Sequence, residues 1–515
     1  MIQNDLFKKI VAHSKEYGFI YQSSEVYDGL SAVYDYGPYG VELKNNIKEY
    51  WWKSMVQMHD NIVGLDAAIF MHPKVWKASG HVDAFNDPLI DNKDSKKRYR
   101  ADVLIEDFVQ NKILAKAEKE VKKAKKRFKE GFDEALFRET NPRVVKYTQQ
   151  AEATLKRLAT AMGAGDLADV KALIEELGIA CPESGSKNWT DVRQFNLMFS
   201  TQLGTIAGEA GKLYLRPETA QGIFVNFLNV QKTTRQKLPF GIAQIGKAFR
   251  NEIVARQFIF RMREFEQMEM QFFVPPGTEL EWYKHWKEAR LKWHQALHPA
   301  KNMRFHDHDN LAHYANAAVD IEYKFPFGFK ELEGIHSRTD FDLGSHQELS
   351  GRKLQYFDSE RNESYVPYVV ETSIGCDRMF FATLATAYQE EMVAGQGGKE
   401  RQRVVLKVHP ALAPVKCAVF PLKRNNPELR SKAKAIYNRL KIDFNCQYDE
   451  TGAIGRLYSR QDAIGTPYCV TVDFDSLEDD TVTVRDRDTL KQERVTVEQL
   501  ADVLAKKVDM KQLLL

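Results

Sequence analysis

The spacing of apolar residues changes along the chain, and the changes predict its organisation. Residues 24–40 are rich in tyrosine and glycine, which suits strands and turns. A long amphipathic helix is predicted over residues 40–58, because apolar residues recur there at helical spacing. Those positions are Val41, Ile47, Trp51, Met55 and Met58. A short apolar run, residues 67–73, follows this helix and predicts a strand that ends at Pro73.

The next segment, residues 102–180, is rich in lysine and has a single apolar stripe. The stripe steps by three and four residues, which predicts a helix with one buried face. Its positions are Leu114, Ala117, Val121, Ala124 and Phe128. Two interpretations of the basic face remain open, a solvated surface or an RNA-facing patch. That face consists of Lys122, Lys123, Lys125, Lys126 and Arg127. Further helical stretches follow, so this block reads as a helical insertion.

Residues 181–403 alternate strand-like runs with turn signals. The clearest strands are 238–249, 265–274 and 365–373, and an amphipathic helix is predicted over 282–297. Strands joined by short loops indicate an antiparallel sheet. The glycine-containing polar stretch 393–403 predicts a linker or mobile loop.

From residue 404 onward, short apolar strands alternate with helical stretches, which indicates a separate α/β domain of about 110 residues. The whole is therefore predicted to be an α+β protein. Its catalytic domain is expected to span 1–101 and 181–403, its helical insertion 102–180, and its C-terminal domain 404–515.

Composition narrows the class of protein. A chain of 515 residues has room for about three domains, at roughly 150 residues each. No run approaches the 18 or so apolar residues of a membrane span, and the N-terminus shows no secretory signal. The five cysteines are few and scattered, which favours reduced thiols and a cytoplasmic location. A net charge of +3 leaves only local patches for contact with nucleic acid.

An arginine-rich hairpin carries the strongest chemical signal. Four arginines fall within fourteen residues between two predicted strands: Arg250, Arg256, Arg261 and Arg263. Guanidinium groups match phosphate oxygens, so the cluster suits a nucleoside triphosphate. The alternative is a set of surface ion pairs with Glu252 and Glu264.

The second strand of this hairpin carries a polar row. Because alternate residues of a strand share a face, Gln267, Glu269 and Gln271 lie together, opposite Glu266 and a second set. That second set is Met268, Met270 and Phe272. A buried polar row is costly unless it binds something, and a carboxylate there would hold an ammonium group. The alternative is a solvent-exposed sheet face.

A third segment, residues 365–391, runs from a strand through Glu371, Ser373 and Gly375 into a helix that carries Arg378. Glycine at such a junction permits close approach of a ligand, and the helix N-terminus favours anions.

In this order, the three segments resemble the signature motifs of the class II aminoacyl-tRNA synthetases. The helix and strand ending at Pro73 look like motif 1, residues 249–252 (FRNE) match motif 2, and residues 375–378 (GCDR) match motif 3. Longer strings resemble the dimeric glycyl-tRNA synthetase family. They are LRPETAQGIFVNF at 215–227, FRNEI at 249–253, FRMREFEQMEMQFF at 260–273, ELEGIHSRTDFDL at 331–343, and residues 371–378.

This resemblance implies a nucleotide site. Arg250 would bind the α-phosphate of ATP, Arg378 the distal phosphates, and Glu331 a magnesium ion that accompanies ATP; these three would be the catalytic residues. Glu252 would contact the adenine side, and Phe265 would stack on adenine. The full implied ATP set is Arg250, Asn251, Glu252, Phe260, Arg261, Met262, Arg263, Glu264, Phe265, Glu331, Leu332, Gly375, Cys376, Asp377 and Arg378.

The resemblance also implies a glycine pocket formed by Glu218, Glu269, Glu371 and Ser373, with Arg100 beside it. The full implied set is Arg100, Glu218, Phe265, Glu266, Gln267, Met268, Glu269, Glu371, Thr372, Ser373, Ile374 and Gly375. The expected reaction is attack of the glycine carboxylate on the α-phosphate, expelling pyrophosphate, followed by transfer to the ribose of tRNA(Gly). Positioning and charge stabilisation would carry it, without a covalent enzyme nucleophile.

Further expectations follow from the same family. The enzyme would be a homodimer through the motif 1 region, with an anticodon-binding C-terminal domain. Four arginines of that domain are candidate phosphate contacts or ordinary surface charges: Arg456, Arg460, Arg485 and Arg487. Thr372 and Ile374 depart from residues common in relatives, although neither departure is expected to abolish activity.

No zinc is expected near Cys181, because its segment holds one cysteine where some relatives have a Cys-x-x-Cys pair. A histidine- and aspartate-rich segment offers metal-ligand types, although a polar loop is the preferred interpretation because closed metal sites need fixed geometry. Its members are His306, Asp307, His308, Asp309 and His313.

Two other functions compete with this one. A different class II specificity, such as threonyl or prolyl, is disfavoured by the RPETAQG and ELEGI strings. A non-catalytic paralogue that only binds nucleic acid should lack the motif arginines, and Arg250, Arg261 and Arg378 are all present.

Overall fold

The computed structural model describes residues 2–129, 132–204, 211–252, 257–308, 311, 314–394 and 400–515. The chain forms two compact units. The first comprises Met1–Ser79, Ser200–Arg250 and Arg256–Leu515, and the second comprises Gly80–Phe199 with Asn251–Ala255. Among the described residues, no helix is both long and apolar enough to cross a membrane.

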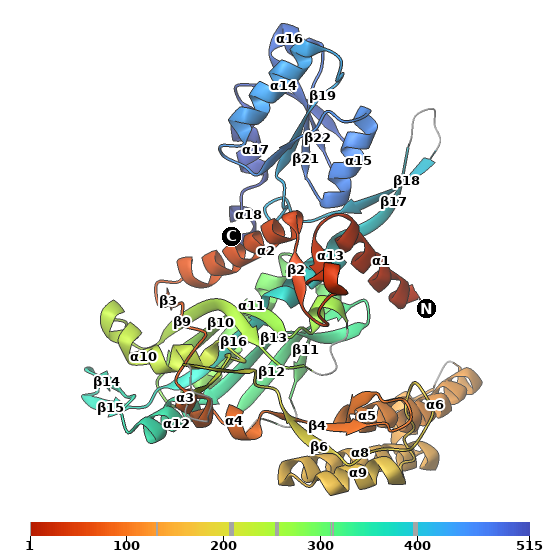
Figure 1. The fold of residues 1–515 in the computed structure, drawn as a ribbon, viewed down its shortest axis with the longest axis vertical. Helices are drawn as coiled ribbons and strands as arrows, with labels where there is room; N and C mark the ends of the chain where they lie inside the picture. The colour runs from red at the N-terminus through yellow and green to blue at the C-terminus, as the bar shows by residue number, and fades with distance from the viewer. Residues whose placement is uncertain are drawn as a thin grey trace. The chain divides into compact units, whose positions relative to one another are not determined.

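A seven-stranded sheet forms the centre of the first unit (Figure 1). Its strands, in spatial order, are β11 (Met303–Asp307), β12 (Ala317–Phe325), β13 (Gly328–Thr339), β16 (Tyr368–Gly375), β10 (Glu264–Val274), β9 (Phe240–Phe249) and β3 (Ile62–Gly64). Every neighbouring pair is antiparallel except β3 and β9. The predicted antiparallel catalytic sheet is thus confirmed.

Helices bury both faces of this sheet. One face packs, through Met268, Met270 and Ile374, into a large core against α2 (Pro38–Trp52), α11 (Glu279–Gln295) and α13 (Cys376–Ala387). On the other face, α10 (Ala220–Thr234) and α12 (Phe341–Ser350) cover one end through Phe224, Phe227 and Phe273. The polar half of that second face is left for the site described below.

The N-terminal helix prediction holds with two adjustments. Helix α2 continues as a π-helix, Lys53–Gln57, so the helical stretch is as long as expected. Ile47, Trp51 and Met55 are buried, whereas Val41 and Met58 are exposed, because the buried stripe also uses Leu43 and Tyr50.

The expected strand ending at Pro73 is wrong. The strand after α2 is β3, Ile62–Gly64, and Pro73 instead begins helix α3, Pro73–Ala78. Between them Phe70 forms only an isolated bridge with Leu215. Proline suits the first turn of a helix because its missing N–H would have no helical partner there.

Short elements complete the N-terminal and central part of the first unit. They are α1 (Ile2–Glu16), β1 (Ile20–Gln22), β2 (Tyr34–Tyr36), β7 (Ser200–Gln202), β8 (Lys212–Tyr214), β14 (Tyr356–Asp358), β15 (Glu363–Tyr365), β17 (Tyr388–Ala394) and β18 (Glu400–Leu406). The segment expected to be a linker, 393–403, falls partly in the paired strands β17 and β18, and residues 395–399 lie outside the described residues.

The C-terminal part of the first unit is the expected alternation of strands and helices around its own core. Its five-stranded sheet has the order β20 (Cys446–Tyr448), β19 (Cys417–Pro421), β21 (Tyr468–Val472), β22 (Thr481–Asp486) and β23 (Gln492–Thr496). Its helices are α14 (Pro427–Leu440), α15 (Ile454–Ile464), α16 (Asp475–Asp479), α17 (Leu500–Lys507) and α18 (Lys511–Leu514).

The second unit contains the lysine-rich helices and a small three-stranded sheet. The strands are β4 (Asn86–Asp91), β5 (Arg98–Arg100) and β6 (Arg193–Asn196), and the helices are α4 (His81–Ala84), α5 (Ala101–Phe108), the π-helix Val109–Leu114, α6 (Ala115–Phe128), α7 (Glu134–Thr140), α8 (Pro142–Ala164) and α9 (Leu167–Glu176). Asn141 caps α8 by accepting hydrogen bonds from the N–H groups of Arg143 and Val144, and Pro142 occupies its first position.

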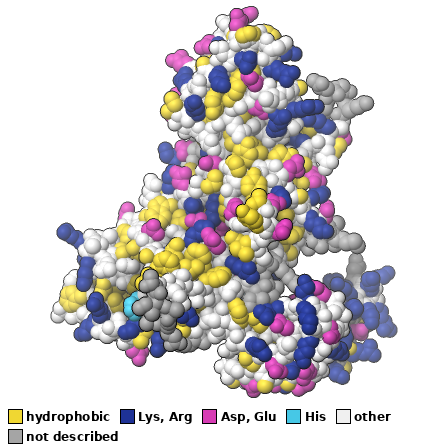
Figure 2. Space-filling view, in the orientation of Figure 1, with side chains coloured by type: hydrophobic (Ala, Val, Ile, Leu, Met, Phe, Trp, Pro, Cys, Tyr) yellow, Lys and Arg dark blue, Asp and Glu magenta, His cyan; other side chains and the backbone are white. Residues whose placement is uncertain are grey.

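Helix α6 carries the predicted stripe, with Ala117, Val121 and Ala124 buried and Phe128 exposed. The basic side chains of residues 122–127 are exposed and gather on one end of this unit (Figure 2). Lys123 pairs with Glu120 at 2.9 Å and Lys125 with Glu134 at 3.4 Å.

Candidate functional site

The polar row on β10 is buried. Gln267 is 8% exposed, Glu269 2% and Gln271 0%. The alternative of a solvent-exposed sheet face is therefore wrong. Groups as polar as these need partners when they leave water, so the row demands either internal hydrogen bonds or a ligand.

The register of the sheet brings further polar residues to the same place. Glu269 lies opposite Gln244 on β9 and Ser373 on β16, and Ser373 lies opposite Gly334 on β13. A side-chain carbon at Gly334 would come within 3.2 Å of the His336 ring, so glycine keeps this row open. Segments more than a hundred residues apart in sequence thus meet on one face of the sheet.

Hydrogen bonds tie two carboxylates of this face together. The Gln271 amide donates to Glu269 Oε1 at 3.2 Å and to Glu371 Oε2 at 2.7 Å. The Thr219 hydroxyl donates to Glu269 Oε2. Gln267 donates weakly to Ser373 Oγ at 3.4 Å, and its own carbonyl accepts from the Thr219 N–H at 3.1 Å.

A buried arginine neutralises one of the two carboxylates. Arg338 donates to Glu371 Oε2 at 3.1 Å and forms a two-pronged contact with Asp342 at 2.8 and 3.0 Å. On its other side, Glu371 Oε1 lies 3.0 Å from His336 Nδ1. Gln221 extends the network by donating to Glu218 Oε1 at 2.9 Å and to Asp342 Oδ1 at 3.0 Å.

These surroundings shift the pKa values of Glu269 and Glu371 in opposite directions. Burial would raise the pKa of Glu371, but Arg338 and His336 outweigh burial and lower that pKa to about 2. Burial and the charges of Glu371 and Glu218 instead raise the pKa of Glu269 well above its usual range. The face is therefore short of positive charge, and a ligand cation would complete it.

A group of cations and aromatic rings lies next to this cluster. Arg378 Nη1 is 3.0 Å from Glu331 Oε2, and its guanidinium lies 4.5 Å from the Phe260 ring centroid. The guanidinium of Arg250 lies 5.3 Å from the Phe265 ring centroid, and its Nε donates to the Pro217 carbonyl at 3.0 Å. The charges of Arg378, and to a lesser degree Arg250, lower the pKa of Glu331.

One of the two glutamates expected to pair with the motif 2 arginines has a lysine partner. Glu264 pairs with Lys247 at 2.6 Å. Arg263 donates to the Ser31 carbonyl at 3.2 Å. Arg256 lies outside the described residues.

Several residues expected at the site lie elsewhere. Glu266 and Asp377 face the buried Lys44, whose Nζ is 3.0 Å from Glu266 Oε2 and 2.8 Å from Asp377 Oδ1. Five more bury their side chains in the hydrophobic core of the first unit: Met262, Met268, Leu332, Ile374 and Cys376. Thr372 pairs in register with Met270, so it too faces away from Glu269.

Three expected residues belong to the second unit. Asn251 and Glu252 are part of its short segment Asn251–Ala255. Arg100 pairs with Asp87 at 3.1 Å and with Asp102 at 2.5 Å within that unit. Their roles at the glycine and ATP sites remain predictions.

The network also holds residues to which the sequence assigned no role: Thr219, Gln221, His336, Arg338 and Asp342. All five lie in the strings that carried the family resemblance, residues 215–227 and 331–343. The sequence shows these residues, but their hydrogen-bond partners lie in distant segments of the chain.

The histidine- and aspartate-rich segment is engaged in ordinary polar contacts. His308 lies 2.9 Å from Asp320, and Asp307 pairs with Lys287 at 2.9 Å. Asp309 and His313 lie outside the described residues. Within the described part of the chain, no group of three or more metal-binding side chains is assembled.

Two candidate RNA contacts in the C-terminal domain are corrected. Arg485 is buried and forms a two-pronged contact with Asp462 at 2.8 and 3.0 Å. Arg487 is buried as well and donates to the carbonyls of Gly465 and Val408. Burial removes both from any phosphate, whereas Arg456 and Arg460 are exposed.

Two family models match long segments of the chain. Residues 205–387 match the tRNA synthetase class II core domain (G, H, P, S and T), and residues 416–507 match the anticodon binding domain. A crystal structure of the RNA binding domain of threonyl-tRNA synthetase from Cryptosporidium parvum shares the fold, with a TM-score of 0.58 and 15% identity over 96% of this chain and 97% of that one. The fold is that of a class II aminoacyl-tRNA synthetase.

Closer relatives narrow this class. Residues 87–197 match the glycyl-tRNA synthetase insertion domain 1. The glycine–tRNA ligase of Chlorobaculum tepidum is 51% identical over 97% of this chain and 99% of its own length. That of Staphylococcus saprophyticus is 49% identical over 97% and 98%. The chain belongs to the glycine–tRNA ligase family.

Proposed function

We propose that the protein activates glycine with ATP, forming glycyl-adenylate and pyrophosphate, and then transfers glycine to the 3′-terminal ribose of tRNA(Gly). The observation that carries this proposal is the cluster formed by the buried Glu269 and Glu371 with the partly buried Glu218, beside two arginines. Such a cluster suits a small ammonium ion, and guanidinium groups suit phosphates. The relatives are glycine–tRNA ligases, an activity that needs both an ammonium site and a phosphate site.

In this proposal Arg250 binds the α-phosphate of ATP, where negative charge grows as the glycine carboxylate attacks. Arg378 binds the distal phosphates and steadies the pyrophosphate that leaves. Phe265 offers its ring to adenine from the same face of the sheet. Preorganised charges of this kind stabilise a transition state without reorganising during the reaction, so no covalent enzyme intermediate is required.

Glycine would be held by its charged ends. Glu218, Glu269 and Glu371 receive the ammonium group, and Ser373 offers its hydroxyl beside them. Because glycine has no side chain to grip, selection must exclude larger amino acids. Arg338, Gln271 and Thr219 hold two of the carboxylates in fixed positions, which favours a pocket too rigid to admit a methyl group.

A magnesium ion is a further part of the proposal. Glu331 fits this role because its carboxylate is partly exposed beside Arg378, and magnesium in such sites takes one or two carboxylates together with substrate phosphates. Bound there, the ion would neutralise phosphate charge. Arg378, now paired with Glu331, would be released toward the phosphates.

The remaining proposals concern partners and location. We expect a homodimer through α2 and the edge strand β3, and recognition of the anticodon by the C-terminal domain. Arg456 and Arg460 stay as candidate RNA contacts because both are exposed. All five cysteines are free thiols, which supports a cytoplasmic location.

Aminoacylation tests this function. The purified protein, with ATP, magnesium and a tRNA(Gly) transcript, should form glycyl-tRNA and should not charge a threonine or proline transcript. Arg250→Ala should nearly abolish charging, whereas Arg361→Ala, an exposed arginine of another surface, should not. Charging by Arg250→Ala at the normal rate would remove Arg250 from the ATP site. A protein that binds tRNA(Gly) but charges nothing would instead support the non-catalytic alternative.

A further inference from the structure

A second cavity lies between three helices of the first unit, away from the sheet face described above. Helices α3, α10 and α12 contact one another, and a space of about 350 Å³ opens among them. That volume is at the lower end for small-molecule sites. Its walls come from Val75 and Ala78 on α3, Val225 on α10 and Leu349 on α12, so the body of the cavity is apolar.

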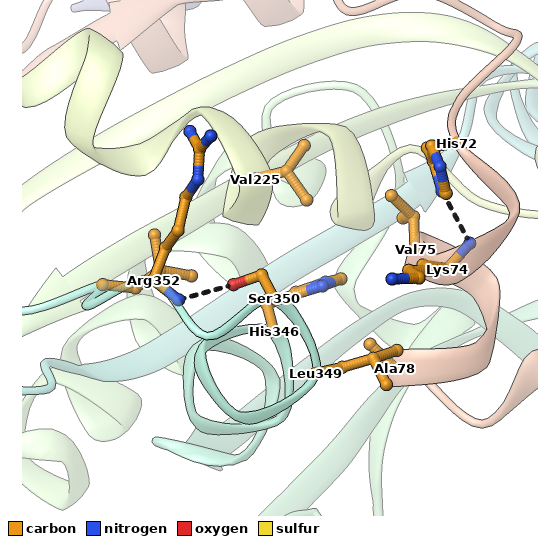
Figure 3. Close-up of a pocket in the computed structure, with 10 residues that line it drawn as sticks. His72, Lys74, Val75, Ala78, Val225, His346, Leu349, Ser350 and Arg352 are labelled. Carbon is orange, nitrogen blue, oxygen red and sulfur yellow. Dashed lines mark hydrogen bonds between the residues drawn. The ribbon is translucent and has the colours of Figure 1, made fainter.

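Positive charge is placed at its edges. Lys74 and Arg352 line the cavity from opposite sides and both are exposed (Figure 3). Neither side chain forms an ion pair with a described residue, and no acidic residue lines the cavity. His72 also lines it, with its Nδ1 occupied by the backbone N–H of Lys74 at 3.2 Å. An apolar space with cations at its rim complements an anion that carries an apolar body.

A buried histidine in the middle of the cavity adds a directional group. His346 is 6% exposed, and its ring lies between Val225 and Leu349 and points toward α3 (Figure 3). Its Nε2 is 2.8 Å from Gln221 Oε1. Gln221 uses its amide nitrogen on Glu218 and Asp342, so its oxygen is an acceptor and His346 Nε2 must donate.

The tautomer follows from that hydrogen bond. Burial lowers the pKa of His346, so the ring is neutral with its proton on Nε2. Nδ1 is then an acceptor, and no described residue donates to it. Because His346 lines the cavity, Nδ1 is available to accept a hydrogen bond from a ligand there.

We propose that this cavity binds a small organic monoanion with an apolar body and a hydroxyl or N–H donor, and that its occupancy acts on the glycine pocket through His346, Gln221 and Glu218. The anion is held by Lys74 and Arg352, the apolar body lies against Val75 and Leu349, and the donor meets His346 Nδ1. The binding part stands on the cavity alone. The effect on glycine rests on the proposed function.

Direct binding tests the first part without any catalytic assay. Isothermal titration of the whole protein with 2-hydroxy-4-methylpentanoate should give saturable binding. Isopentyl phosphate tests whether a phosphate can replace the carboxylate. The uncharged 3-methylbutan-1-ol tests whether binding needs an anion. Loss of the anion removes charge-assisted hydrogen bonds, so the alcohol should bind about tenfold to a hundredfold more weakly. Equal binding of the alcohol, or no saturable binding of either anion, would overturn the site.

Variants locate the binding. Ala78→Phe fills the cavity, and the pair Lys74→Ala with Arg352→Ala removes its cations; each should abolish or weaken binding at least about tenfold. Lys77→Ala, a neighbouring exposed lysine that does not line the cavity, is the matched control and should bind normally. The double variant Lys74→Ala, Arg352→Ala changes only exposed residues, so it still tests the site if Ala78→Phe does not fold. Normal binding by that pair would place the anion elsewhere.

Steady-state pyrophosphate exchange tests the second part. Saturating 2-hydroxy-4-methylpentanoate should change the KM for glycine at least twofold in the wild-type protein and should leave it unchanged in the Lys74→Ala, Arg352→Ala pair. If the probe binds but the KM for glycine does not change, the cavity is a binding site that has no effect on the glycine pocket, and the second part of the proposal is wrong. Absence of any glycine-dependent exchange would instead sink the proposed function, and the titration would still report on the cavity.

Discussion

Arg378 Nη1 lies 3.0 Å from Glu331 Oε2, so the two residues proposed to handle the distal phosphates and the magnesium ion are paired with each other. Arg378 also donates to the carbonyls of Phe260 and Glu331, each at 3.3 Å. These contacts hold the guanidinium over the Phe260 ring. The ion pair with Glu331 holds the Arg378 guanidinium in position before ATP binds. Nucleotide binding would then replace the Glu331 carboxylate with phosphate oxygens as the partner of Arg378.

The first prediction concerns that exchange of partners. Arg378→Ala should raise the KM for ATP about tenfold to a hundredfold, because it removes charge-assisted hydrogen bonds to phosphate. The KM for glycine should change much less, since the hydrogen bonds and ion pair of Arg378 with described residues go to Glu331 and Phe260, not to Glu269 or Glu371. Steady-state pyrophosphate exchange with each substrate varied in turn measures both. Equal changes in the two constants would place Arg378 in a shared structural role.

The second prediction concerns the ammonium pocket. Glu269→Gln keeps the shape of the side chain and its hydrogen bond with Thr219 but removes the negative charge. The KM for glycine should rise at least tenfold, as expected for loss of about 1.4 kcal/mol or more of ion pairing, and the KM for ATP should stay near normal. Glu279→Gln, a buried glutamate at the start of α11, is a control for loss of a buried carboxylate. If both substrates weaken equally, Glu269 does not hold the ammonium group.

The third prediction concerns pH. The raised pKa of Glu269 means that the empty pocket tends to hold a proton there, and an incoming ammonium group must displace it. The KM for glycine should therefore fall as the pH rises through that pKa and then level off. Glu371, with its pKa lowered to about 2, stays ionised and adds no slope.

His336 is the confounding group, because its contact with Glu371 outweighs burial and raises its pKa. Loss of its positive charge at higher pH would also favour an ammonium ion. His336→Gln should keep the slope that belongs to Glu269, and Glu269→Gln should lose it. A flat wild-type profile between mildly acidic and mildly alkaline buffers would contradict the protonated state of Glu269.

The fourth prediction concerns the C-terminal domain. Asp462 joins Arg485 to Arg403, whose Nη1 lies 2.9 Å away, and all three side chains are buried. Asp462→Ala should lower the free energy of unfolding by about 3–5 kcal/mol, because it leaves the buried Arg485 without a counter-charge and leaves Arg403 with Glu391 alone. Arg456→Ala, at an exposed position of the same domain, should leave stability nearly unchanged. Chemical denaturation measures both, and comparable stability in the two variants would contradict the buried network.

The sequence predicted local patterns well. The alternation on β10 placed Gln267, Glu269 and Gln271 on one face, and the helical spacing around Ile47 and Trp51 identified α2. Both patterns reflect the geometry of a single element, which the chain carries locally.

Contacts between distant segments could not be predicted from the sequence. Arg338 meets Glu371 only because β13 and β16 are neighbours, and Gln221 meets Asp342 across 121 positions of sequence. For the same reason Arg485 looked like a surface charge until the sheet placed Asp462 beside it. Periodicity says which face a residue occupies, but the partner on that face depends on strand order.

Activation of glycine is the reaction proposed for this site. The most direct measurement is ATP–pyrophosphate exchange by the purified protein with each of the twenty amino acids, without tRNA. The proposal predicts rapid exchange with glycine and at most background exchange with alanine, serine, threonine and proline. Exchange driven by another amino acid, or no exchange with glycine, would contradict it.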